Sequence, residues 1–224
     1  MDTTNPPSPL SGRQLRHAFG LVLTIALALA AAAPAALAAP AQRSTTGVMW
    51  HPQSGAGPVD GGTASLVRTS SGVSAVLRTN ELKPHHAYTV WFVAIDNPAA
   101  CANTHCSGPD ILLNPATDAQ VTFGAGHVVG ASGKAGFAVH MPAGPIDGWL
   151  PGRSFDDPLG AEIHLILNDH GPALAAHLPG MIQTYRGGCA DDSPFPPIFP
   201  PTALADGEPG PNECRLYQLA VFLP

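Results

Sequence analysis

The stretch HAYTVWFVAI, residues 86–95, decides the fold class of this chain. It is rich in β-branched and aromatic residues, and it is apolar on both alternations of a period-two pattern. Such a pattern is typical of a strand that is covered on both faces in the middle of a sheet. The dipeptide Asn97-Pro98 ends the strand, because a residue that precedes proline avoids the helical region. The sequence therefore predicts a central β-strand over residues 86–95.

Other short extended runs lie on both sides of this strand and are separated by turn residues. Residues 64–69 and 73–79 flank Ser70-Ser71-Gly72, and this spacing predicts a β-hairpin. Further strands are predicted over residues 119–123, 127–129, 135–141, 161–168 and 216–223. The chain also contains 24 glycines and 25 prolines, which interrupt helices. We therefore predict an all-β fold, an antiparallel β-sandwich (Ig-like or similar) of about eight strands with long Pro/Gly-rich loops.

The N-terminal residues have the pattern of a secretory signal peptide. Arg13 and Arg16 precede an apolar run over residues 18–38 that ends in Ala36-Leu37-Ala38. An uncleaved membrane anchor is the alternative, because the run is long enough to cross a bilayer. We expect cleavage, release from the membrane, and a secreted, periplasmic or extracellular protein. The predicted organisation is a signal peptide over residues 1–38, a loose lead-in over 39–62 and a single β-sandwich domain over 63–224.

Charge and motifs narrow the function classes. The formal net charge is −6 and the chain after residue 38 has no cluster of lysine and arginine, which argues against nucleic acid and anionic lipid as partners. No Gly-x-Ser-x-Gly or His-Glu-x-x-His motif is present, so the common hydrolase sites are unsupported. We expect a non-enzymatic extracytoplasmic binding or structural module. Its ligand could be a protein, a glycan or a small molecule.

The four cysteines, Cys101, Cys106, Cys189 and Cys214, form an even set. In an exported chain such a set favours disulfides over free thiols. Three pairings are possible, and the spacing favours Cys101–Cys106 and Cys189–Cys214. A zinc site that includes His105 is the alternative, although a Cys-x4-Cys spacing with distant partners is not a recognised zinc pattern.

Strand periodicity assigns the histidines to faces. In residues 161–168, the predicted core positions are Ala161, Ile163, Leu165 and Leu167, and the opposite positions are Glu162, His164, Ile166 and Asn168. In residues 135–141 the side chain of His140 lies opposite the apolar set. If these two strands pair, His140, His164 and Glu162 converge, with His170 at the strand end. Such a set suits Zn²⁺ or Cu²⁺ as a cofactor, and solvated or hydrogen-bonded surface histidines are the alternative interpretation.

Three further features have a structural interpretation and a functional one. Asp169 is expected to bind backbone N–H groups of the following Gly171-Pro172 turn, although an Asp-His neighbour pair could also orient a catalytic imidazole. Trp149 lies in a Gly/Pro-rich excursion, where it either folds back over the sheet or stacks on a sugar. The segment SPFPPIFPP, residues 193–201, either covers the sandwich or forms a partner surface.

Three motifs resemble those of a family of secreted bacterial all-β proteins to which no activity is attached. They are VWFVAIDNPAAC (90–101), GHVVGASGKAGF (126–137) and GAEIHLILNDHGP (160–172). The resemblance implies an exported β domain and carries over no catalytic residues. The chain also looks loosely similar to chordin-type domains and to copper/zinc superoxide dismutases, but it has no His-x-His pair of the kind that the dismutase requires.

Overall fold

The computed structural model describes residues 40–195 and 197–224, so the predicted signal peptide over residues 1–38 lies outside the described residues. No helix within the described residues is long and apolar enough to cross a membrane. The strands are β1 (Gln42–Trp50), β2 (Pro58–Thr69), β3 (Gly72–Thr79), β4 (His86–Ile95), β5 (Ala119–Val128), β6 (Ala135–Pro142), β7 (Gly144–Pro145), β8 (Ser154–Phe155), β9 (Glu162–Pro172) and β10 (Arg215–Phe222). The helices are short: η1 (Pro98–Ala100), α1 (Gly108–Leu113), η2 (Pro115–Thr117), α2 (Leu178–Met181) and α3 (Pro201–Leu204).

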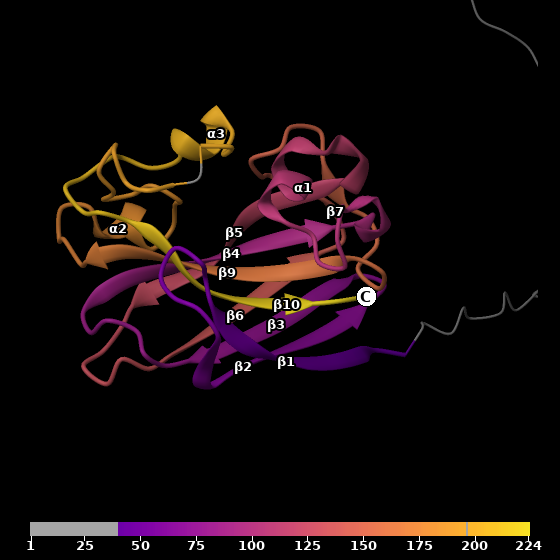
Figure 1. Ribbon diagram of the computed structural model, residues 1–224, viewed down its shortest axis with the longest axis horizontal. Coiled ribbons are helices and arrows are strands. Elements are labelled where there is room, and N and C mark those ends of the chain that lie inside the picture. The colour runs from indigo at the N-terminus through magenta and orange to yellow at the C-terminus, as the bar shows by residue number, and fades with distance from the viewer. Residues whose placement is uncertain (1–39, 196) are drawn as a thin grey trace, which may run out of the picture. The chain divides into compact units, whose positions relative to one another are not determined.

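One eight-stranded sheet dominates the fold, in the order β5-β4-β9-β10-β1-β2-β3-β6, and β7 pairs with β8 in a small second sheet. Neighbouring strands are antiparallel throughout. The edge strands β5 and β6 come into contact, and the rings of His127 and Phe137 stack there with their centroids 4.8 Å apart. The sheet therefore curls almost into a barrel (Figure 1). The predicted all-β antiparallel fold is confirmed, with the two layers formed by opposite walls of one curled sheet.

The predicted strands agree with this sheet in most places. Strand β4 has the predicted bounds and lies between β5 and β9, buried along almost its whole length. The hairpin is β2–β3, closed by the pair Thr69 and Gly72. The runs predicted separately over residues 119–123 and 127–129 form one continuous strand, β5. Its register against β4 shifts between Val90 and Trp91, and this bulge interrupts the alternation that the sequence pattern relies on.

The prediction of a loose lead-in over residues 39–62 is wrong, because this segment contains β1 and the first part of β2. Val48 is the one fully buried residue of β1, and most of the others are exposed. Backbone pairing with β2 and β10, rather than an apolar face, therefore holds β1 in place. A strand of this kind carries almost no hydrophobic period, so the sequence pattern misses it.

Two apolar clusters lie on opposite sides of the sheet. The interior cluster fills the curled sheet and includes Leu66, Tyr88, Phe92, Phe155 and Leu165, all fully buried. The core positions predicted at the start of β9 and just before it belong to this cluster, namely Ala161, Ile163, Leu165 and Leu167. The outer cluster covers the other face of β4 and β9 and includes Trp91, Val93, Trp149, Tyr185 and Leu216. The outer face is therefore also a packed surface.

Two covers lie over opposite ends of this outer face (Figure 1). The α1 cover, residues 101–113, is closed by the disulfide Cys101–Cys106. The C-terminal cover, residues 178–195 and 197–214, is closed by the disulfide Cys189–Cys214. Both predicted cysteine pairings are confirmed. A Cβ on Gly108 of the α1 cover would lie 3.4 Å from Ile198, so the two covers meet above the sheet.

Candidate functional site

A cavity of about 530 Å³ lies on the outer face of the sheet, where the two covers meet. Its floor is apolar and comes from β4, β9 and β10, with Ile166 paired between Trp91 and Leu219. The α1 cover supplies Ile111 and Leu112 to the walls. Ile166 and Leu219 are only partly buried, unlike the apolar residues on the inner face of β9. The middle of the outer face therefore stays accessible between the covers.

The opposite wall of the cavity is aromatic. The ring centroids of Trp91 and Trp149 are 4.4 Å apart, and those of Trp149 and Tyr185 are 4.6 Å apart. Phe199 packs on both Trp149 and Tyr185. Trp149 is 6% exposed, so it folds back over the sheet as the structural interpretation expected. Phe195 and Phe199 pack against the same cluster, which confirms that the Pro-rich segment covers the sheet.

Histidines and one tyrosine, Tyr185, are the titratable residues that line the cavity, and no lysine, arginine, aspartate or glutamate among the described residues lines it. The lining histidines are His51, His105 and His164. Burial lowers the pKa of His51 to about 4. This imidazole is therefore neutral at physiological pH, and its Nδ1 atom accepts the backbone N–H of Gln53 at 3.2 Å. The cavity offers apolar surface and few charges to a ligand.

Glu162 and His164 form a buried pair beside the cavity. They are two residues apart on β9 and share its outer face, where their side chains are 1% and 6% exposed. Oε1 of Glu162 lies 2.6 Å from Nε2 of His164 and accepts the backbone N–H of Cys106 at 3.0 Å. Glu162 thereby links the sheet to the α1 cover.

The environment of Glu162 keeps this side chain ionised. Burial by itself raises the pKa of a carboxyl, but the hydrogen bonds from His164 and Cys106, with the charges of His164 and His105, outweigh it. The net effect is a lowered pKa for Glu162. An ionised carboxylate only accepts hydrogen bonds, so Nε2 of His164 carries the proton. In the neutral imidazole, Nδ1 is then the acceptor.

The structure does not assemble the four residues predicted to bind a metal. Glu162 and His164 meet, but β6 pairs with β3 rather than with β9. His140 is exposed on β6, and its Nδ1 atom lies 3.0 Å from Oγ of Ser74. The proposed convergence required β6 and β9 to be neighbours, and the strand order separates them.

His170 is fully buried at the far end of β9. Its Nδ1 atom lies 2.9 Å from the carbonyl oxygen of Gly187, and its Nε2 atom lies 2.8 Å from Oγ1 of Thr89. Burial lowers the pKa of His170 to about 4, although the Gly187 bond and the charge of Asp169 oppose this effect. His170 is therefore hydrogen-bonded, but it lies on a covered face and is not a surface histidine.

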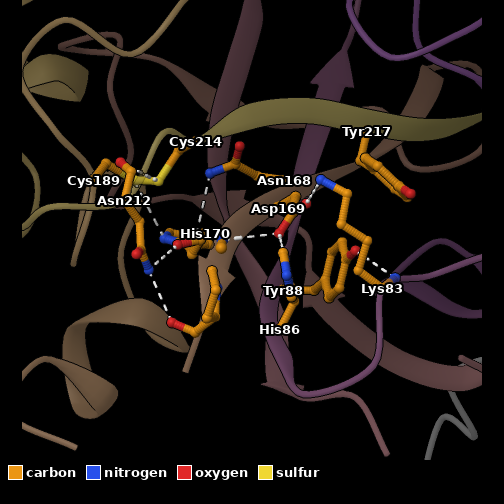
Figure 2. A network of polar contacts seen from close by, with 12 residues as sticks. Lys83, His86, Tyr88, Asn168, Asp169, His170, Cys189, Asn212, Cys214 and Tyr217 are labelled. Carbon is orange, nitrogen blue, oxygen red and sulfur yellow. Dashed lines mark hydrogen bonds and ion pairs between the residues drawn. A yellow bond between two sulfur atoms is a disulfide. The ribbon is translucent and has the colours of Figure 1, made fainter. Parts of the chain in front are cut away.

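One group in the described residues has the spacing of a metal site, namely His170, Cys189 and Cys214. Figure 2 shows that the two cysteines are joined to each other as a disulfide beside the His170 ring. Disulfide sulfurs are not thiolates, and thiolates are the form in which cysteine binds metals. The group is therefore a structural anchor of the C-terminal cover.

Asp169 has the structural role expected of it. It is 1% exposed, and its Oδ1 atom accepts the backbone N–H of Gly171 at 2.8 Å. The same carboxylate binds Nδ1 of His86 at 2.8 Å and Nζ of Lys83 at 3.1 Å (Figure 2). These bonds tie β9 to β4 and to the turn before it. The side chains of Asp169 and His170 point to different partners, so they do not form a catalytic dyad.

The sequence patterns missed the cavity itself. His51 and His105 belong to segments far apart in the chain, and no spacing rule connects either of them to His164. No family model, curated protein or solved structure matches the chain.

Proposed function

We propose that this protein is an exported, non-enzymatic binding protein that holds a small neutral molecule in the cavity between its two covers. The observation that carries the proposal is a cavity of about 530 Å³ with an apolar floor, an aromatic wall and a few imidazoles. Small-molecule sites in proteins are typically concave, mostly apolar and about 300–1,000 Å³ in volume. The two disulfides and the signal-like N-terminus support export.

The charges around the cavity favour a neutral ligand. A carboxylate or phosphate would enter a pocket whose lining contains no lysine or arginine among the described residues. It would also approach the ionised Glu162 behind His164. Because a buried charge without a partner is costly, anionic ligands bind poorly in such a site. A cation gains little from Glu162, whose carboxylate already has two partners.

The proposal is tested with N-phenyl-1-naphthylamine, a neutral dye that becomes fluorescent in apolar surroundings. We expect saturable binding with one dye per chain. Ile166→Trp places a large side chain on the cavity floor and should weaken dye binding at least tenfold. Ala138→Trp adds the same side chain at an exposed position of β6 and should leave the affinity unchanged.

Circular dichroism of both variants verifies that each one retains the fold. The proposal is wrong if the wild-type protein shows no saturable binding. It is equally wrong if the two tryptophan variants bind the dye as tightly as each other, because the dye would then bind elsewhere.

A further inference from the structure

Nδ1 of His164 has no hydrogen-bond partner among the described residues, although the ring is almost completely buried. Nε2 of the same ring is bound to Glu162 at 2.6 Å, and the side chain is 6% exposed. The described side-chain nitrogens and oxygens that are both closed to solvent and without a partner belong to Asn80, Asp96, Asn168, His177, Tyr185 and Arg186. His164 is not one of these residues, so Nδ1 belongs to the small part of the ring that stays open.

This open part of His164 faces the cavity. The side chain lies on the outer face of β9 between Val93 of β4 and Val221 of β10, and all three residues line the cavity. Glu162 and the amide of Cys106 close the Nε2 side of the ring. A molecule in the cavity can therefore reach Nδ1.

Glu162 determines the role of Nδ1. The ionised carboxylate accepts a hydrogen bond from Nε2, so in the neutral ring the proton is on Nε2 and Nδ1 has only a lone pair. The bond to the carboxylate also polarises the ring, because hydrogen bonds in a chain strengthen one another. The cavity therefore presents a good acceptor for a donor on a ligand.

The other two lining histidines do not present such an acceptor. Nδ1 of His51 already accepts the backbone N–H of Gln53 at 3.2 Å, so the other nitrogen of this neutral ring is a donor. His105 is exposed, and water can pair with its nitrogens whether or not a ligand is bound. Among the lining histidines, a buried ring with an unpaired acceptor is therefore found at His164.

The cost of covering this acceptor selects the ligand. Water can pair with Nδ1 in the free protein, but an apolar molecule on the cavity floor would displace that water. A covered acceptor without a partner costs about 1–3 kcal/mol. A ligand that carries its own donor avoids this cost.

We infer that the cavity selects neutral apolar compounds that carry a hydroxyl group, whose O–H donates to Nδ1 of His164. This inference rests on the proposed function, since it names the class of ligand that the same cavity binds. The apolar floor, with the partly exposed Ile166 and Leu219, holds the body of the ligand. His164 recognises its hydroxyl, and Glu162 holds the ring in the form that accepts.

The test compares 2-naphthol with 2-methylnaphthalene, which carries a methyl group in place of the hydroxyl. Both are measured by displacement of N-phenyl-1-naphthylamine at about pH 8, above the ordinary pKa of histidine. His164→Gln keeps a donor near the position of Nε2 and has no acceptor at the position of Nδ1. The affinity of naphthol relative to methylnaphthalene should be about tenfold lower in this variant than in the wild type. His140→Gln makes the same replacement at an exposed position of β6 and should leave the ratio unchanged.

A second measurement uses the wild type alone, so it does not depend on the folding of His164→Gln. The nitrogen-15 resonance of an imidazole nitrogen moves upfield when the nitrogen accepts a hydrogen bond. Nδ1 of His164 should therefore resonate further upfield in the naphthol complex than in the methylnaphthalene complex. Equal positions in the two complexes overturn the inference.

The possible failures are distinguishable. Absence of saturable dye binding overturns the proposed function together with this inference. If the dye binds and neither naphthalene displaces it, the inference alone is overturned. An affinity ratio that is the same in the wild type and in His164→Gln also overturns it, even if both compounds bind more weakly, because the packing of the ring would then be responsible. An equal fall of the ratio in His140→Gln does the same.

Discussion

Replacing Glu162 with glutamine should lower the free energy of unfolding by about 2–3 kcal/mol at neutral pH. The carboxylate binds the imidazole of His164 at 2.6 Å and the amide of Cys106 at 3.0 Å, in a site that is almost closed to water. Hydrogen bonds to a charged group contribute about 1.5–3 kcal/mol each. Glutamine has nearly the same shape and keeps one neutral acceptor, so it retains part of this energy.

The expected loss can be measured as a shift in the thermal unfolding midpoint, followed by circular dichroism. For a domain of this size, 1 kcal/mol corresponds to about 2–4 °C. Glu162→Gln should therefore lower the midpoint by roughly 5–10 °C. The matched control is Glu213→Gln, because Glu213 is 62% exposed and pairs with Arg215 at the surface. Its effect should stay within about 0.5 kcal/mol.

The pH dependence gives a second measurement on the same variant. The folded protein lowers the pKa of Glu162, so the unfolded chain takes up the proton first as the pH falls. The stabilisation is present in full above the ordinary carboxyl pKa of about 4.3 and is lost as the pH falls through the folded value. The difference in the free energy of unfolding between wild type and Glu162→Gln should therefore narrow as the pH falls below about 4.3. A variant as stable as the wild type at pH 7 would contradict this prediction. A difference in the free energy of unfolding that stays constant as the pH falls below about 4.3 would do the same.

Two further predictions concern the anchors of the covers. Replacing both cysteines of Cys189–Cys214 with serine should lower the free energy of unfolding by about 3.5 kcal/mol, because this disulfide closes a loop of 25 residues. The same replacement of Cys101–Cys106 should lower it by about 2 kcal/mol, because that loop spans 5 residues. Urea unfolding measures both values, and an equal loss in the two variants would contradict the loop-length argument. Burial lowers the pKa of His170 from 6.5 to about 4. As the pH falls, the unfolded chain therefore takes up this proton before the folded protein does. The free energy of unfolding of the wild type should fall by about 3 kcal/mol between pH 6.5 and pH 4. His170→Asn should lack this part of the slope in urea titrations, and parallel wild-type and variant curves would disprove it.

The parts of the fold that could be predicted from the sequence are those in which burial follows a period of two residues. Strand β4 is apolar on both faces and β9 alternates, so the sequence predicts both strands, and for β9 it also predicts the inner residues. Strand β1 was missed because one fully buried side chain, Val48, leaves no period to detect. In β5 a bulge between Phe123 and Ala125, opposite Val90 and Trp91, breaks the alternating pattern, so the sequence divides this strand in two.

The candidate site was predictable only in part, because period two gives the face of a residue but not what covers that face. Glu162 and His164 were correctly placed together on the face opposite the core. That face was expected to be a solvated surface or, if β6 paired with β9, to carry a metal site, and it is covered instead by segments that follow β4 and β9 in the chain. The strand order, which keeps His140 away, depends on pairings between distant segments that no local pattern specifies.

The position of the cavity follows from how the two faces of the sheet are buried. The interior of the curled sheet contains large, fully buried side chains such as Tyr88, Phe92 and Phe155. The outer face is apolar along the pairs of β9 with β4 and β10, and each cover buries one end of it. Between the covers, Ile166 and Leu219 remain partly exposed, and burial of such apolar surface is favourable by about 25 cal/mol per Å². The proposed neutral ligand would complete this burial without introducing a charge.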